Sequence, residues 1–530
     1  MDISPDNVGS KELHHEVFKE VDSSTDSPRV TMSTEADVRD MSRLGKDQQF
    51  NRIFRQSTMI MFTSMIQGTW EVVLLANTGG LVNGGLAGMF WGYIWTFAGF
   101  FSIVMSLAEM ASMAPTSGGQ HHWVSEFAPR KHQRFLSYMS GWMSTLSWQA
   151  GTAGSAFIMG VLIQGCVVGY HPTYSPKRWQ GTLFVFAFSA VQGIVNTFLA
   201  AQLPRIQKVM IVPHAFGWIA VIIVLAALAP HASAKDVFTN FSSNEGWEPI
   251  GVSLMVGQIN SVYLLILSDS AAHLSEEVKD AAKSVPRAMM WSFVLNGTVG
   301  FFVLVAFLFA IPDISAALSP ETNPSGFTFL YVFQKASYHG SIPLTLILIF
   351  VALAGGIDSN CTTSRQLFAF ARDGGFPLRS WLVQVHNRTV PRNAVIMTCT
   401  ISVLLSLINL GSTVAFNAII SLQLLALMST YFLSIGCVFY QRLFGGPQSL
   451  PPAKWSLGRY GIFINGFGTF YTFFILFWAG WPASRHVTPK TFNWGPVMFA
   501  AVFLFSLVYF VAFGKKSYQG PVVLVKQLSM

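Results

Sequence analysis

Long apolar stretches recur along the whole chain. A helix needs about 20 mostly apolar residues to cross about 30 Å of hydrocarbon, because only a helix satisfies its own backbone there. One stretch, 327–333, is too short for this, and we expect an external surface helix; the eighth span is expected to continue past Asp358 to Arg365 and Ala369. The pattern predicts an all-α integral membrane protein with twelve spans, at residues 57–81, 86–110, 138–168, 180–200, 208–229, 250–270, 289–311, 342–362, 393–410, 414–439, 463–482 and 495–513.

The spans divide the chain into three parts. Residues 1–55 are rich in Ser, Asp, Glu and Lys and have no apolar run behind a basic start. We therefore expect a disordered cytoplasmic tail without a cleaved signal peptide, in which case the first apolar span acts as the membrane signal. Residues 56–514 form the twelve-helix domain, and residues 515–530 form a second cytoplasmic tail.

Composition supports the membrane assignment. Of the 530 residues, 52% are hydrophobic and only 11% are charged. A soluble domain carries about 25% charged residues, so this chain could not cover a water-facing surface, and a soluble enzyme is excluded. The four cysteines lack the short spacings of a metal site and are interpreted as packing residues. We expect no cofactor.

The distribution of basic residues predicts which side of the membrane each loop faces. The chain has 33 Lys and Arg against 25 Asp and Glu. An even number of spans puts both termini on one side, and positive charge favours the cytoplasm. With cytoplasmic termini, the basic residues lie in every inner loop, a spread that argues against nucleic acid binding. The external loops then hold only six of the 33, namely Lys177, Arg178, Lys235, Lys335, Arg485 and Lys490.

Ionisable residues inside the predicted spans are functional candidates, because a charge at mid-membrane costs about 2.5 to 3.5 kcal/mol. Four carboxylates qualify: Glu71, Glu109, Asp269 and Asp358. The alternative for each is a position near a span end, from which the side chain reaches the interface.

Two spans are interrupted by polar residues at similar places. Gln67, Gly68 and Thr69 interrupt the first span, and the run 268–270 interrupts the sixth. A helix broken at membrane depth exposes amides and carbonyls, which line a cavity and bind small ions. Breaks five helices apart are typical of an inverted repeat of five plus five helices. The alternative is that Gly and Ser only allow close helix packing.

Three motifs, in order and correctly spaced against the spans, resemble one known family. These are SLAEMASMAPTSGGQHHWV after the second span (106–124), DSAAHLSEE with VPRAM after the sixth (269–277 and 285–289), and SRQLFAFARDGGFP after the eighth (364–377). They are similar to the fungal amino-acid/choline transporter (ACT) branch of the amino acid, polyamine and organocation (APC) superfamily. The resemblance covers about residues 50 to 515.

The resemblance implies a LeuT-like fold: a 5+5 inverted repeat with broken helices 1 and 6, plus two C-terminal helices. Family members carry amino acids, GABA, choline or related amines, commonly driven by protons. The chain lacks a Gly-Ser-Gly run in the first span, which leaves less room for a substrate carboxylate. Carried over residue by residue, the substrate site maps to Ile66, Gln67, Gly68, Thr69, Trp70, Leu267, Ser268 and Asp269.

Several side chains are candidates for particular roles. Trp70 or Tyr263 could place an aromatic face against a cationic amine, with core packing as the alternative. The proton-coupling candidates are Glu71 and Asp269, whose neutral forms burial favours, and Lys208, whose alternative is a simple inside-facing charge. Adjacent His121 and His122 point apart on a helix, so we expect no metal site. An inner gate is expected from His273, Glu276, Glu277 and Arg287, with a solvated charged loop as the alternative.

The sequence therefore predicts a secondary transporter, and not an enzyme, that moves a small amine or amino-acid-like solute by alternating access with protons. Two alternatives stay open: a specialised permease of a secondary metabolite or alkaloid-like amine, and a non-transporting nutrient sensor on the same scaffold. The plasma membrane is the first expectation for its location, with a vacuolar or vesicular membrane as the alternative. Asn240 begins a glycosylation sequon in a predicted external loop.

Overall fold

The computed structural model describes residues 33–530 except 172, 412–413, 447–448, 519 and 522–530. Eleven of its helices are long and apolar enough to cross a membrane. The prediction of an all-α membrane protein is confirmed. The helices of the predicted spans are α3 (Gln56–Gln67), α4 (Thr69–Leu75), α6 (Gly85–Met113), α8 (Gln133–Tyr170), α9 (Arg178–Phe198), α10 (Leu203–Leu228), α12 (Ile250–Tyr263), α13 (Ser270–His273), α14 (Ala281–Phe309), α17 (Ser341–Arg372), α19 (Arg392–Ser406), α21 (Ala415–Phe444), α22 (Gly461–Ala479) and α23 (Gly495–Tyr509).

The sixth predicted span is the one missing from those eleven. It divides into α12 and the short α13, with a non-helical linker at 264–269, so that neither part spans alone. Leu267 in the linker has φ +76°. The first span is broken at Gly68, which has φ +47° and ψ +41° and separates α3 from α4. Glycine adopts this left-handed conformation readily, which explains why the helix breaks there. The eighth span does continue to Arg372, as expected.

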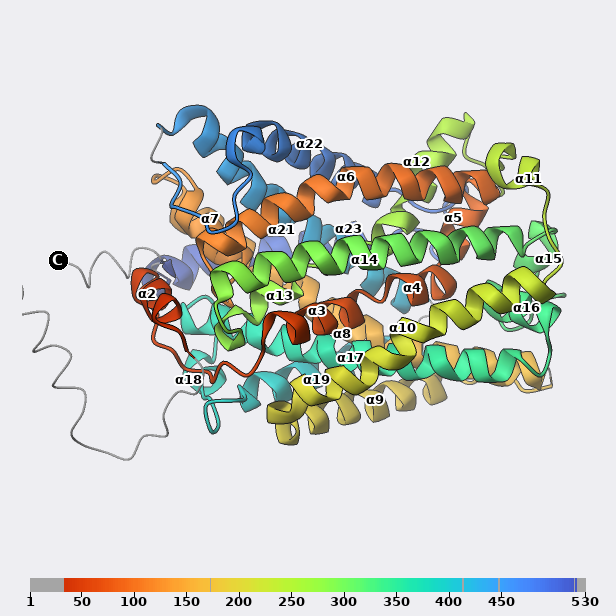
Figure 1. The fold of residues 1–530 in the computed structure, drawn as a ribbon, viewed down its shortest axis with the longest axis horizontal. Coiled ribbons are helices and arrows are strands. Elements are labelled where there is room, and N and C mark those ends of the chain that lie inside the picture. Colours follow the sequence, from red (N-terminus) through yellow and green to blue (C-terminus); the bar gives the residue numbers. More distant parts are fainter. Residues whose placement is uncertain (1–32, 172, 412–413, 447–448, 519, 522–530) are drawn as a thin grey trace, which may run out of the picture. The chain divides into compact units, whose positions relative to one another are not determined.

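The long helices of the described part run side by side (Figure 1). The short helices α2 (Glu35–Arg43), α7 (Gln120–Phe127) and α18 (Arg379–Leu382) lie at one end, and α5 (Thr78–Val82), α11 (Ala234–Thr239) and α15 (Ile314–Leu318) at the other. Helix α10 packs against α3, α14 and α17, while α8 packs against α17 and α21. Helix α12 packs against α6 and α22, so both broken helices lie against unbroken ones.

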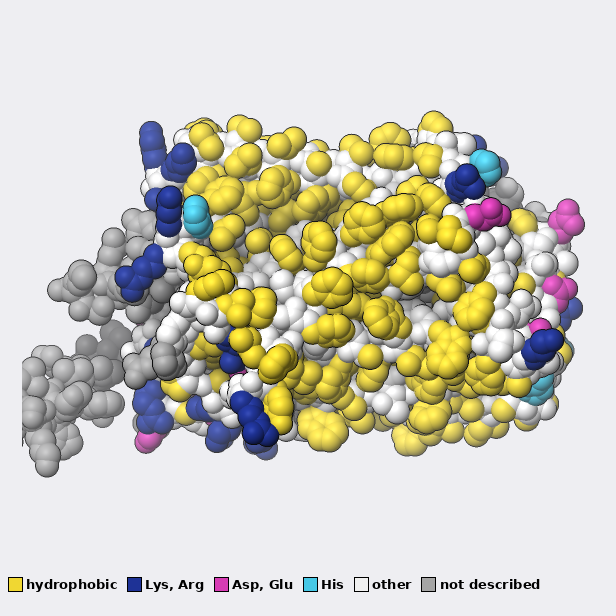
Figure 2. Space-filling view, turned by 90° about the horizontal axis from the view of Figure 1, so that it is seen from above, with side chains coloured by type: hydrophobic (Ala, Val, Ile, Leu, Met, Phe, Trp, Pro, Cys, Tyr) yellow, Lys and Arg dark blue, Asp and Glu magenta, His cyan; other side chains and the backbone are white. Residues whose placement is uncertain are grey.

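Side-chain chemistry separates the ends from the middle. Figure 2 shows apolar side chains over the middle of the visible face and Lys and Arg gathered at the end that carries α2 and α7, which we call the basic end. On α22 and α23, Phe463, Phe470 and Val508 are 75%, 61% and 66% exposed. Such exposure is expected on a surface that faces lipid, because large apolar side chains in contact with water would be unfavourable in free energy.

Two expectations need correction. Residues 33–55 were expected within a disordered tail, but they are ordered, because buried Asp37 and Arg52 find partners at the basic end. The part of the expected tail at 1–32 lies outside the described residues. The apolar stretch 327–333 does form a helix, α16 (Thr328–Ala336), yet Phe329 and Phe333 on it are fully buried, so it packs into the protein instead of lying on its surface.

Candidate functional site

A cavity of about 860 Å³ lies between the two helix breaks. Its walls come from α3, α4, α8, α12, α17 and α21, and it extends to Lys490 in the loop before α23 and to Ser325 in the loop between α15 and α16, two helices that lie at the end opposite the basic one (Figure 1). Of the predicted substrate residues, those on its wall are Ile66, Gln67, Gly68, Tyr263 and Leu267.

Glu71 places a carboxylate beside the break in the first span. Its side chain lines the cavity and is 2% exposed. A Cβ added at Gly68 would lie 3.5 Å from Glu71 Oε2 and equally far from the Met65 carbonyl oxygen. The carboxylate therefore stands next to the turn, close to the peptide groups that the break exposes.

The partner of Glu71 is a histidine on another helix. His214 Nδ1 of α10 lies 2.6 Å from Glu71 Oε1. Glu71 Oε2 is buried and has no hydrogen-bond partner among the described residues. Trp70 helps to fix the position of His214, because its indole N–H donates to the His214 carbonyl oxygen at 3.2 Å. His214 thus holds one carboxylate oxygen of Glu71, while the other makes no hydrogen bond to the described residues.

The two aromatic candidates differ in position. Tyr263 lines the cavity, and its hydroxyl donates to the Ile420 carbonyl oxygen at 2.9 Å, which fixes the ring. Trp70 is fully buried outside the cavity wall, where its ring approaches Gly217 on α10. Of the two, Tyr263 can face a bound cation. Thr69 and Ser268 are likewise absent from the wall.

Two proton-coupling candidates also lie away from the cavity. Asp269 accepts a hydrogen bond of 2.6 Å from Gln120 Nε2 of α7 and lies 3.7 Å from His273 Nε2. Lys208 is exposed on α10 and forms no ion pair with any described acid. The expectation that Lys208 exchanges charge with a neighbour stays a prediction; in this conformation the adjacent Gln207 is the buried one of these two residues of α10.

Buried ion pairs close the basic end. Glu276 receives two hydrogen bonds of 2.8 Å from the Arg372 guanidinium at the end of α17, and Thr116 and the Ser117 amide also donate to it. Burial alone raises the pKa of Glu276, but Arg372 and these donors outweigh burial and lower it to about 2. The pair therefore stays charged at physiological pH.

A second pair lies beside the first, between Glu277 Oε1 and Arg365 Nε at 2.7 Å. His273 contacts the Ser117 carbonyl oxygen at 3.0 Å. The gate prediction needs one correction: Arg287 is exposed on α14 and pairs with neither glutamate. Both arginine partners come from α17 instead.

The segment 34–55, which we call the strap, adds a further layer at the basic end. Lys46 forms an ion pair with Asp373, which also contacts His121 Nε2 at 3.0 Å. Burial raises the pKa of Asp373, but Lys46 and His121 hold it well below its usual range. The strap thereby links α17 to α7.

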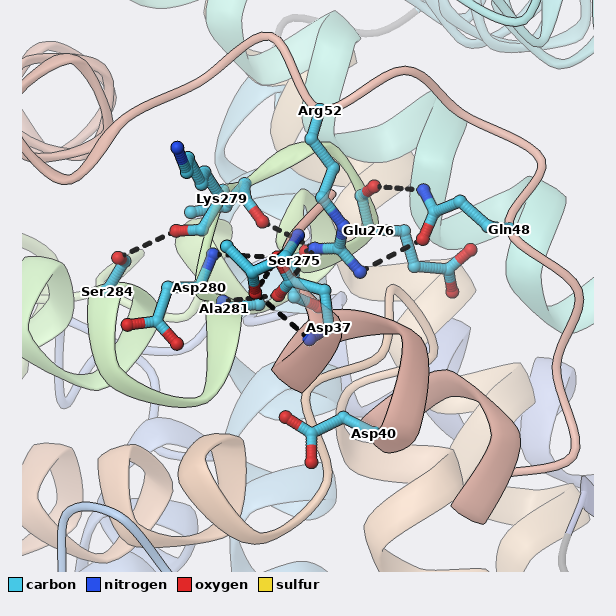
Figure 3. Close-up of polar contacts among 12 residues, drawn as sticks. Asp37, Asp40, Gln48, Arg52, Ser275, Glu276, Lys279, Asp280, Ala281 and Ser284 are labelled. Atoms are coloured by element: carbon cyan, nitrogen blue, oxygen red, sulfur yellow. Dashed lines mark hydrogen bonds and ion pairs between the residues drawn. The ribbon is translucent and has the colours of Figure 1, made fainter. Parts of the chain in front are cut away.

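Asp37 and Arg52 join the strap to the start of α14 (Figure 3). Asp37 accepts from the backbone amides of Asp280 and Ala281 at 3.0 and 3.1 Å, which caps that helix. Arg52 lies 3.4 Å from Asp37 and donates to the Ser275 carbonyl oxygen at 3.0 Å. Both side chains are almost fully buried, so the strap is part of the closure and not a loose tail.

The remaining two carboxylates differ in their surroundings. Glu109 accepts from Arg442 Nη2 at 2.6 Å and from the Leu457 amide at 2.9 Å, which makes it a structural ion pair near a helix end. Asp358 has no such cation. Its Oδ1 accepts from Gln207 Nε2 at 2.7 Å, and its Oδ2 is buried without a partner among the described residues.

Sequence reasoning missed four functional neighbours: His214, Gln207, Arg365 and Arg372. Each lies far along the chain from its partner, and single-sequence patterns do not report such contacts. For His214 and Gln207 a signal was present, because both are polar residues on the largely apolar helix α10 and lie seven positions, or two turns, apart on one face.

Comparison of the sequence with known proteins identifies the family. A family model described as amino acid permease matches residues 53–504. The chain belongs to the amino acid permease family. It is 27% identical to a choline transporter of Saccharomyces cerevisiae over 86% of this chain and 80% of the relative. It is 26% identical to Amino-acid permease 2 of Neurospora crassa over 93% and 90%, and 27% identical to Amino-acid permease BAT1 of Arabidopsis thaliana over 91% and 95%. The protein is a multi-pass membrane permease and a secondary transporter.

Proposed function

We propose that this permease is a proton-coupled carrier of small solutes with a cationic amine head group, with choline as the first substrate to test. The observation that carries the proposal is Glu71, which lines the cavity at the helix break and whose buried Oε2 has no hydrogen-bond partner among the described residues. A desolvated carboxylate attracts an ammonium strongly. The Tyr263 ring adds a cation–π surface on the opposite broken helix.

The cavity favours an amine without an adjacent carboxylate. Among the described residues, the one basic side chain on its wall is Lys490, which is exposed in the loop before α23. Amides at a helix break commonly receive a substrate carboxylate, but here the Glu71 carboxylate stands beside that turn. Like charges repel there, so an α-amino acid binds less well than choline or a simple amine.

The arrangement of open and closed ends supports alternating access. If the basic end faces the cytoplasm, as positive charge favours, the described conformation is outward-facing. Its cavity extends toward the external loops, while Glu276, Glu277 and the strap close the inner side. Asn240 is exposed in a loop at the outer end, where glycosylation is possible in the secretory pathway. The plasma membrane is the proposed location.

A transport assay tests this function. Purified protein is reconstituted into liposomes, and entry of radiolabelled choline is measured with and without an inward proton gradient. Unlabelled GABA, lysine and leucine serve as competitors. We expect choline entry to rise with the gradient and leucine to compete least. A rate of choline entry that is the same with and without the gradient contradicts proton coupling. Stronger inhibition of labelled choline entry by unlabelled leucine than by unlabelled choline contradicts the proposed substrate class.

Glu71→Gln tests the site itself. The change keeps the shape of the side chain and removes its charge. A quaternary ammonium has no N–H to donate, so the loss is that of the charge–charge attraction, about 1.5 to 3 kcal/mol at about 5.5 Å and an effective dielectric constant of about 20 to 40. Choline affinity should therefore fall by about tenfold to a hundredfold. Glu245→Gln is the matched control, because Glu245 is a half-buried carboxylate that lines the same cavity. Equal choline affinity in Glu71→Gln and wild type removes Glu71 from the site.

A further inference from the structure

We propose that Asp358 binds the proton that is coupled to transport, at a site distinct from the Glu71 substrate site. The inference rests on the proposed function, since it names where the coupled proton sits. Asp358 lies on α17 and is bound by Gln207 of α10. The same helix α10 also carries His214, the partner of Glu71.

The geometry of Asp358 fits a carboxyl group that carries a proton. Its side chain is 1% exposed, and so is that of Gln207. Gln207 Nε2 donates to Oδ1 at 2.7 Å, while Asp358 Oδ2 and Gln207 Oε1 are both buried without hydrogen-bond partners among the described residues. A proton on Oδ2 gives that oxygen an O–H donor and leaves Oδ1 to accept from Gln207 Nε2 as before. The pair therefore accommodates both protonation states.

The charged form of Asp358 has no cationic side chain paired with it among the described residues. On α10, the adjacent Lys208 is exposed. On α17 itself, Arg365 lies two turns away and is engaged by Glu277, and Cys361 is the next titratable group. From α3, no charged side chain occurs between Gln56 and Gln67. An unpaired buried charge costs several kcal/mol, so the neutral carboxyl group is the stable form in this conformation.

The other titratable groups nearby are Glu71 on α4 and His214 on α10, and these bind each other. His214 and Gln207 are seven residues apart on α10, about 10.5 Å along the axis at 1.5 Å per residue. The two acid pairs are thus stacked along one face of α10, with Asp358–Gln207 nearer the basic end.

Asp358 lies directly behind the cavity wall and close to the end of α3. The next residue, Ser359, lines the cavity, as does Gly355 one turn earlier. A Cβ added at Gly355 would lie 3.1 Å from the Met65 carbonyl oxygen at the end of α3. A proton from the cavity can therefore reach the carboxylate past the cavity wall, and movement of α3 away from α17 would expose it toward the basic end.

The proton step balances as follows. A hydronium ion in the cavity transfers its proton to Asp358 Oδ2, forming the O–H bond and leaving a water molecule. After the basic end opens, the O–H bond breaks and the proton passes to cytoplasmic water, which restores the carboxylate. Because the charged form is poorly tolerated while the site is buried, the carrier changes conformation with the proton in place.

Asp358→Asn separates proton coupling from transport. The variant keeps a hydrogen-bonding partner for Gln207 and cannot gain or lose a proton. Radiolabelled choline is the probe, in liposomes whose membrane potential is clamped at zero. With one coupled proton, a gradient of one pH unit supports about tenfold accumulation. We expect wild type to reach this ratio and Asp358→Asn to show none, while exchange of external for internal choline continues unchanged.

Each outcome distinguishes this inference from the proposed function. Gradient-driven accumulation by Asp358→Asn overturns the inference and leaves the carrier function standing. Loss of exchange together with accumulation, at an unchanged melting temperature, also overturns it, because Asp358 would then act in the transport step itself. Absence of gradient-driven accumulation in wild type overturns proton coupling altogether.

Infrared difference spectra of wild type provide a second test that does not depend on the folding of Asp358→Asn. A protonated carboxyl band should be present at neutral pH, and Asp358→Glu should shift that band. A spectrum that Asp358→Glu leaves unchanged overturns the assignment. Glu71→Gln should retain the band while it weakens choline binding, which keeps the proton site and the substrate site apart.

Discussion

Replacing Arg372 by Gln should release the predicted inner gate. The variant leaves Glu276 fully buried without its guanidinium partner. Removing one member of a buried ion pair costs about 3 to 5 kcal/mol. The lower value applies here, because Thr116 and the Ser117 amide still donate to the carboxylate. In an inward-open state Glu276 meets water, so the cost falls mainly on the closed state.

A destabilisation of about 3 kcal/mol shifts the equilibrium toward the inward-open state by about a hundredfold. The assay is alkylation of a cysteine introduced at Ser275, which is buried beside Glu276, in a background without the four native cysteines. Arg372→Gln should speed labelling by a membrane-impermeant reagent applied to the basic end.

Arg442→Gln is the matched control for this experiment. Arg442 and Glu109 form an ion pair of similar burial, with 16% and 1% exposed side chains against 12% and 0% for Arg372 and Glu276. That pair lies outside the gate, so its loss should lower the melting temperature without speeding labelling. Equal labelling rates in Arg372→Gln and wild type, or equal acceleration by both variants, would refute the gate reasoning.

Three further predictions concern the break, the strap and the pH range. Gly68→Ala should lower the free energy of unfolding by about 1 to 2 kcal/mol, because alanine is strained at φ +47°; an unchanged denaturation midpoint would contradict this. Asp37→Asn should loosen the strap, seen as faster proteolysis before residue 55, whereas unchanged cleavage would mean that capping of α14 does not depend on the charge. The pKa of Glu276 is lowered to about 2 from 4.5, so its charge stabilises the fold above pH 4.5, and this contribution is lost as the pH falls toward 2. Glu276→Gln should therefore melt at a lower temperature than wild type at neutral pH, and the two melting temperatures should converge as the pH approaches 2.

The spans and the two helix breaks could be predicted from the sequence because their causes are local. Apolar length determines a span, and Gly68 allows the left-handed turn that ends α3. The sixth span was predicted as one interrupted segment, and the structure divides it at 264–269. Local chemistry was therefore sufficient to locate the cavity.

Side-chain partners could not be predicted in the same way. Glu71 and His214 are 143 positions apart, and only the packing of α10 brings them together. The same packing turns Trp70 and Lys208 away from the cavity, although their residue types suited the roles expected of them. Strap residues 34–55 have a polar composition typical of disorder, yet a few buried ion pairs and caps are enough to order them.

The most direct test of the central claim is an experimental density map of the protein with bound choline. The account predicts density for the quaternary ammonium between the two breaks, against Glu71 Oε2 and within about 6 Å of the Tyr263 ring centroid, with α3 ending at Gln67. Choline bound elsewhere, or an unbroken helix through Gly68, would contradict the account.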